Sequence, residues 1–158
     1  MANDENSLTG MKQFLELLPD TVLIVNKEGF IEDLLNYQPE ISLFLTPQQQ
    51  KGQTIRELFC YKNLRGDSGN ELLNAFLDTM ETRKSNIIHY EVENEGHIGY
   101  AEGYIIPFED YTFGIFRNMT KRVEAQLETI NEKNKLTMAL KAGNLSVWSY
   151  LPETDTFD

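Results

Sequence analysis

The sequence predicts an α+β domain with a five-stranded antiparallel sheet, flanking helices, an N-terminal helix and a long C-terminal helix. The first observation is the order of segments: a helix, two strands, several helices, three strands and a final helix. The second is that short turns such as Asn94-Glu95-Gly96 separate neighbouring strands, so consecutive strands can pair as hairpins. The third is that strands and helices do not alternate one by one, as they would in a parallel sheet.

The N-terminal part predicts a helix followed by a hairpin. Residues 1–6 are polar and acidic, and we expect them to form a disordered tail. Residues 7–18 predict a helix that ends at Pro19, because their apolar side chains fall on one stripe. The stripe consists of Leu8, Met11, Phe14, Leu15 and Leu18. Residues 21–25 and 30–35 are rich in aliphatic residues and predict two strands joined by an Asn-Lys-Glu-Gly turn.

Short helices, one longer helix and three strands are predicted next. Residues 36–70 are punctuated by Pro and Gly, and short helices are expected near residues 40–45 and 54–60. Residues 71–83 form an amphipathic pattern and predict a helix. The strands that follow are residues 87–93, residues 97–106, which Pro107 stops, and residues 111–118.

Composition excludes several classes of protein. The chain has 158 residues, of which 41% are apolar, enough for one globular domain with some additional sequence. Its net charge of −11 argues against nucleic acid or an anionic membrane surface as a direct partner. A single Cys, no apolar run long enough to span a membrane and an acidic N-terminus favour a cytoplasmic location. A membrane anchor elsewhere in a longer parent protein stays open.

Five segments, in this order, resemble a PAS domain over residues 7–120. They are LLPDTVLIVNKEGFI (17–31), KGQTIRELF (51–59), ELLNAFLDTMETRKSNIIHYEVE (71–93), AEGYIIP (101–107) and RNMT (117–120). The resemblance implies a sensory domain without catalytic activity of its own. It also implies that Arg117, Asn118, Met119 and Thr120 couple the sheet to the following helix, since they stand where the family has an Asp-x-Thr motif. Asn118 replaces the usual Asp, so a weaker or uncharged coupling is expected.

The C-terminal segment resembles the start of a second PAS domain. Residues 134–158 contain a helix ending at Gly143 and then a strand through Trp148. The expected organisation is thus a PAS domain, a linker or signalling helix at residues 121–143 and a truncated second domain at residues 144–158. Tandem PAS units of this kind are similar to those of bacterial sensor histidine kinases, some of them hybrid, in two-component phosphorelays. Cyclases and transcription regulators with PAS modules remain alternatives.

One face of the last two strands is expected to face the family's ligand pocket. It carries Ala101, Gly103, Ile105, Gly114 and Phe116. Flavin-binding relatives use amide side chains there. Haem-binding relatives place a His on the helix before the third strand, and residues 71–83 of this sequence contain no His. No cofactor is therefore expected, although a haem- or flavin-bearing sensor is kept as an alternative. Either the small residues leave a cavity for a small apolar ligand, or helices close onto them.

Catalytic and metal-binding patterns find little support. The sequence has no nucleophile elbow, no paired-His metal helix and no phosphate-binding glycine loop. His89 and His97 are interpreted as ordinary surface residues, and Cys60 as a plain, partly buried thiol. A small α+β enzyme would need clustered ionisable groups with perturbed pKa values, and none is suggested.

Two apolar surfaces point to packing partners. Tyr100, Tyr104, Ile106, Phe113 and Ile115 share the sheet face opposite the pocket, and we expect residues 7–18 to cover them. In the C-terminal helix, which Thr120 is suited to cap, Val123, Leu127 and Ile130 follow the spacing of a coiled-coil seam. The favoured function is therefore a sensory and dimerisation module that regulates a downstream histidine kinase. A monomer whose helix packs on its own sheet is the alternative.

Overall fold

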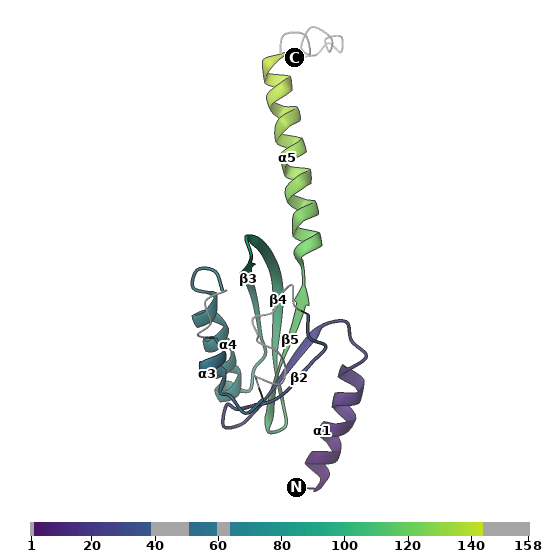
Figure 1. The fold of residues 1–158 in the computed structure, drawn as a ribbon, viewed down its shortest axis with the longest axis vertical. Helices are drawn as coiled ribbons and strands as arrows, with labels where there is room; N and C mark the ends of the chain where they lie inside the picture. The colour runs from purple at the N-terminus through teal and green to yellow at the C-terminus, as the bar shows by residue number, and fades with distance from the viewer. Residues whose placement is uncertain (1, 39–50, 60–63, 144–158) are drawn as a thin grey trace. The chain divides into compact units, whose positions relative to one another are not determined.

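The computed structural model describes residues 2–38, 51–59 and 64–143 (Figure 1). The chain divides into two units, residues 1–120 and residues 121–158. The elements are α1 (Ala2–Leu15), β1 (Thr21–Asn26), β2 (Ile31–Leu35), α3 (Ile55–Leu58), α4 (Ser68–Thr82), β3 (Asn86–Asn94), β4 (His97–Phe108), β5 (Tyr111–Asn118) and α5 (Thr120–Ala142). The helix expected near residues 40–45, Cys60 and the expected second domain lie outside the described residues.

The five strands form one antiparallel sheet in the order β2-β1-β5-β4-β3, which confirms the predicted fold class. The first and last strands along the chain, β1 and β5, are therefore neighbours at the centre of the sheet. This placement brings the beginning of β1 beside the end of β5, with Thr21 opposite Phe116.

Helices cover both faces of the sheet (Figure 1). The inner face packs against α3 and α4, and its core includes Leu23, Leu72 and Phe76. The outer face packs against α1 in a smaller core that includes Leu8, Leu15 and Phe113. Successive residues of β1 alternate between these two cores, as the two-residue period of a strand requires.

Helix α1 differs from its predicted limits at both ends. Residues 2–6, expected to form a disordered tail, belong to α1, where the carboxylate of Glu5 suits the positive end of a helix. The helix ends at Leu15 instead of residue 18 because the hydrogen-bonding pattern after it changes from four-residue to tighter three-residue steps. The amides of Leu17 and Leu18 bond to carbonyls only three residues back. Pro19 also disfavours helical geometry in the residue before it.

Strand β4 continues through Pro107, where we expected it to stop. The last β3 partner in this direction is Asn86, which lies opposite Ile105. Pro107 pairs only with Thr112 of β5, so the missing N–H of proline leaves no gap in a ladder with β3.

Candidate signal-coupling site

The four consecutive residues predicted to couple the sheet to the final helix span the junction between β5 and α5. The amide of Thr120 donates to the side-chain oxygen of Asn118 at 3.0 Å. The amide of Met119 donates to the carbonyl of Tyr100 at 2.8 Å. The Thr120 hydroxyl accepts from the amide of Tyr100 at 3.1 Å. The start of α5 is thus bonded directly to strand β4.

Thr120 was expected to cap the helix, and the structure gives that role to another residue. Helix α5 begins at Thr120 itself, and the Thr120 hydroxyl is directed to β4. Asn118 accepts the amide two residues ahead, as Asx turns do, and its neutral side chain makes this bond without a charge. Asn in place of Asp therefore keeps a hydrogen bond at this junction.

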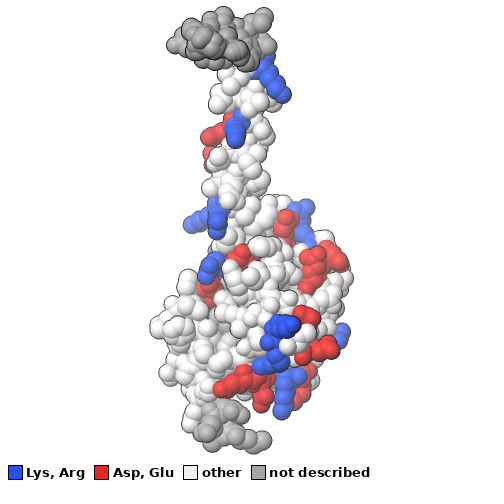
Figure 2. Space-filling model, turned by 180° about the vertical axis from the view of Figure 1, so that it is seen from behind, with Lys and Arg blue, Asp and Glu red and all other residues white. Residues whose placement is uncertain are grey.

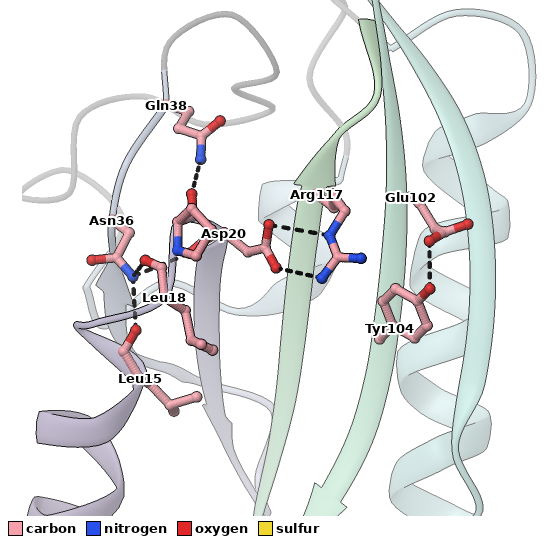
Figure 3. A network of polar contacts seen from close by, with 9 residues as sticks. Leu15, Leu18, Asp20, Asn36, Gln38, Glu102, Tyr104 and Arg117 are labelled. Carbon is pink, nitrogen blue, oxygen red and sulfur yellow. Dashed lines mark hydrogen bonds and ion pairs between the residues drawn. The ribbon is translucent and has the colours of Figure 1, made fainter. Parts of the chain in front are cut away.

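Arg117 pairs with Asp20, a residue that the sequence did not single out. The guanidinium Nε and Nη2 atoms lie 3.4 and 3.1 Å from the two carboxylate oxygens (Figure 3). The Asp20 side chain is only 9% exposed, whereas that of Arg117 is 53% exposed. The hydrogen bond and the charge of Asp20 raise the pKa of Arg117. Asp20 directly precedes β1, so this ion pair joins the beginning of the sheet to its end.

A row of polar side chains extends from this pair across the outer face. Glu102 lies opposite Arg117 in the β4–β5 ladder, and His89 lies opposite Glu102 in the β3–β4 ladder. His89 Nε2 is 2.8 Å from one Glu102 oxygen. The Tyr104 hydroxyl donates to the other Glu102 oxygen (Figure 3). The bonds from Tyr104 and then His89 lower the pKa of Glu102. His89 is highly exposed, as expected, but it has this specific partner.

Asn36 ties the segment before β1 to the end of β2. Its side-chain amide donates to the carbonyls of Leu15 and Leu18 at 2.9 Å each and to that of Asp20 at 3.1 Å (Figure 3). Its own carbonyl accepts from the Thr21 hydroxyl at 2.8 Å. Asn36 has a left-handed backbone, with φ of 54°, which Asn tolerates better than most residues.

Aromatic rings fill the inner face beside the two predicted pocket glycines. A Cβ atom at Gly114 would lie 2.5 Å from the Phe76 ring, and one at Gly103 would lie 3.1 Å from the Phe116 ring. Ala101, Ile105 and Phe116, the other predicted lining residues, are buried in the same core. At Gly114 the Phe76 ring of α4 closes onto the sheet, whereas at Gly103 the side chains of Phe116 and Ile88, from β5 and β3, fill the space.

Among the described residues, two buried side-chain atoms have no hydrogen-bond partner. They are the hydroxyl of Tyr90 and the side-chain oxygen of Gln53. The Tyr90 ring packs edge-on against Phe116 with ring centroids 5.9 Å apart. Burial raises the pKa of Tyr90. Neither residue was predicted as a site residue.

Helix α1 covers part of the apolar outer face, as expected, but not all of it. Phe113 is buried in the outer core and Ile115 packs against that core. Tyr100, Tyr104 and Ile106 are half-exposed. Phe14, which the predicted stripe placed on the sheet, points away and is 61% exposed, because α1 buries the side of Leu8 and Leu15.

Helix α5, described by itself, buries none of its residues. Leu127 and Ile130 of the predicted seam are 46% and 52% exposed. Within the described ranges, no group of side chains could hold a metal ion, and no helix is long and apolar enough to cross a membrane.

No protein-family model and no curated protein matches the sequence significantly. Solved structures do match it. The PAS domain of Bordetella pertussis BvgS has 20% identity and a TM-score of 0.50, covering 83% of this chain and 98% of its own. The phage VqmA–DPO complex has 12% identity and a TM-score of 0.58, and the match covers 82% of this chain and 60% of that one. An RNA-binding Light-Oxygen-Voltage receptor has 10% identity and a TM-score of 0.52, and the match covers 84% of this chain and 37% of that one. The five-stranded sheet with its flanking helices therefore has the fold of PAS domains.

Proposed function

We propose that this chain is a sensory and dimerisation module that relays a signal to a downstream histidine kinase in a two-component phosphorelay. The observation that supports it best is the junction between β5 and α5. There, Met119 and Thr120 bond to strand β4, and Asn118 bonds to the first amide of α5. A shift between β4 and β5 would therefore change the hydrogen bonds that define the start of the helix. The chain itself would transmit a state and catalyse no reaction.

Helix α5 is the proposed output and dimer contact. An unburied helix of 23 residues gains little stability from its own sequence and needs an apolar partner. Its Val123, Leu127 and Ile130, none of which is buried, would pair with those of a second copy. In a longer parent protein, the downstream PAS and kinase domains would follow α5 along the chain. We place the module in the cytoplasm.

The sensed ligand is proposed to be small and apolar, if one is bound at all. Phe76 and Phe116 occupy the space beside Gly114 and Gly103, so such a ligand would enter by displacing a ring. We expect neither haem nor flavin, and purified protein should be colourless. A Soret band, or flavin absorbance that survives dialysis, would favour the cofactor-bearing alternative.

Nucleic acid is not a proposed partner. Acidic and basic side chains are interspersed on the face of the molecule that Figure 2 shows, and the net charge is −11. Phosphate contacts require clustered basic side chains.

A kinase chimera tests the proposal. Residues 1–143 would replace the sensory part of a dimeric histidine kinase, and autophosphorylation would be measured with ATP. Asn118→Ala removes the acceptor for the first amide of α5 and should change the rate severalfold. Asn70→Ala is the matched control, since Asn70 is exposed on α4 and bonds only to Asp67. A rate that Asn118→Ala leaves unchanged would argue against a relay through this junction.

A further inference from the structure

The connection between α1 and β1 is held by side-chain amides of the segment after β2. Asn36 donates to Leu15, Leu18 and Asp20 carbonyls. Gln38 donates to the carbonyl of Pro19 (Figure 3). The carbonyl of Leu15, at the end of α1, accepts from the amide of Leu18 and also from the side chain of Asn36. The position of the end of α1 and the position of Asp20 therefore depend on the same side chain.

Asn36 has more acceptors than it can serve equally. An amide NH₂ group has two N–H bonds, and three carbonyl oxygens lie within hydrogen-bond distance of its nitrogen. Two acceptors must share one N–H, so each of those bonds is weaker than a linear one. If α1 moves and withdraws the Leu15 carbonyl, the amide can turn fully to Leu18 and Asp20. The Asn36 amide can therefore serve these carbonyls in more than one arrangement.

Asp20 carries that change to the far end of the sheet. Its main-chain carbonyl is held by Asn36, and its buried carboxylate is held by Arg117 of β5. Arg117 lies next to Asn118, which bonds to the first amide of α5. The connection from α1 to α5 therefore passes through three side chains: Asn36, Asp20 and Arg117.

This connection lies apart from the inner core. Arg117 is on the outer face of β5, in register with Glu102, whereas Phe116 before it points into the inner core. A ligand in the inner core would act through residues such as Phe116. A displacement of α1 would act through Arg117.

We propose that α1 is a second input to the module: a displacement of α1 reaches the start of α5 through Asn36, Asp20 and Arg117, independently of the inner core. The inference rests on the proposed function only in taking the start of α5 as the output. A segment or domain that precedes α1 in a longer protein would use this input.

Amide hydrogen exchange of the full chain, followed by NMR, tests the proposal. The reporting amides are those of Tyr100, Met119 and Thr120, which form the junction. Asp20→Asn and Arg117→Gln should each raise their exchange rates roughly threefold or more, as expected for loss of a partly exposed ion pair. The double variant should exchange no faster than either single variant, because both changes break one pair.

Asn36→Gly is the decisive variant. Glycine accepts the left-handed backbone of this position but removes the amide. The junction amides, which Asn36 does not contact, should exchange faster, and the increase should disappear when Asp20→Asn is already present. Arg65→Gln serves as the control, since it removes ion pairs with Glu91 and Glu93 of the edge strand β3. It is read at Met119 and Thr120, because Glu91 lies opposite Tyr100 in the β3–β4 ladder. Amides of Leu23 and Val25 report whether the sheet core stays folded.

Two results would overturn the inference. One is that Asn36→Gly leaves the exchange rates of the junction amides unchanged. The other is that the effects of Asn36→Gly and Asp20→Asn on those rates are fully additive. Neither depends on the kinase chimera. If Asn118→Ala alters phosphorylation while Asn36→Gly leaves the exchange rates of the junction amides unchanged, the relay is supported and the second input is refuted. If Asn36→Gly alters those exchange rates and phosphorylation responds to no variant, the coupling is supported and the proposed relay is refuted.

Discussion

The ring of Phe76 lies where a side chain on Gly114 would begin. The distance from the tip of the ring to a Cβ atom built at Gly114 is 2.5 Å, well inside van der Waals contact. Phe76 belongs to α4 and Gly114 to the middle of β5, three residues before Arg117. The helix on the inner face therefore contacts the strand that leads into α5, and only glycine permits that approach.

Gly114→Ala should destabilise the domain by about 1–3 kcal/mol, since the added methyl forces Phe76 or the strand to move. Gly10→Ala is the matched control. Gly10 lies in α1 with no atom within 4 Å of a built Cβ, so alanine should raise stability by roughly 0.5–1 kcal/mol. Chemical denaturation measures both. A Gly114→Ala variant as stable as the parent would mean that the inner core has unfilled space there.

Tyr90→Phe should leave stability unchanged or raise it by about 1 kcal/mol, because it removes a buried hydroxyl that has no partner among the described residues. The edge-on packing against Phe116 is kept by phenylalanine. Thermal unfolding of the two proteins measures the difference. A clear loss of stability in the variant would instead identify a bound water or ligand that pairs with the hydroxyl.

Leu15→Ala should cost about 2–5 kcal/mol of unfolding free energy, because Leu15 is buried in the outer core. Phe14→Ala, one position earlier, should change it by less than about 0.5 kcal/mol, since Phe14 is exposed. Denaturant titrations compare the two variants. Equal losses would show that α1 presents a different side to the sheet. By the same reasoning, deletion of residues 1–18 should cause aggregation or a large loss of stability.

Glu102→Gln should reduce stability at neutral pH and have less effect in acid. The bonds from Tyr104 and His89 lower the pKa of Glu102 below its ordinary value of 4.5, so the folded state favours the ionised form. That contribution is complete above the unfolded pKa and is lost as pH falls through the folded pKa. The difference in unfolding free energy between parent and variant should therefore shrink between neutral pH and about pH 3. A difference that does not vary with pH would exclude a role for the charge.

The strands could be predicted because their signal is local. The alternation in residues 111–118 and the turn at residues 94–96 fix strand and hairpin without knowledge of the rest of the chain. Ion pairs between distant segments carry no such signal. Asp20 and Arg117 are 97 residues apart, and only the central pairing of β1 with β5 makes them neighbours. Asn36 is missed for the same reason, since three of its partners are main-chain carbonyls.

One missed feature did have a local signal. Thr54 and Glu57 form a capping box at the start of α3, with Glu57 accepting the amide of Thr54 at 2.8 Å. The spacing Thr-x-x-Glu predicts this arrangement. Thr120 was expected as a cap from its residue type alone, since Glu124 lies one place past the capping-box position, and its hydroxyl instead accepts from the amide of Tyr100 in β4. Tertiary contacts thus override a local preference at the junction.

The central claim is that α5 joins two chains so that the state of one sheet can reach the domain that follows. Light scattering at micromolar concentration measures it most directly. The parent protein should have twice the 18.2 kDa mass of one chain. Leu127→Asp with Ile130→Asp should give a monomer, because two charges would face each other in the seam. Ala125→Asp with Thr129→Asp, on exposed positions outside the seam, should remain a dimer. A parent protein of monomer mass, or a dimer that Leu127→Asp with Ile130→Asp leaves intact, would contradict the account.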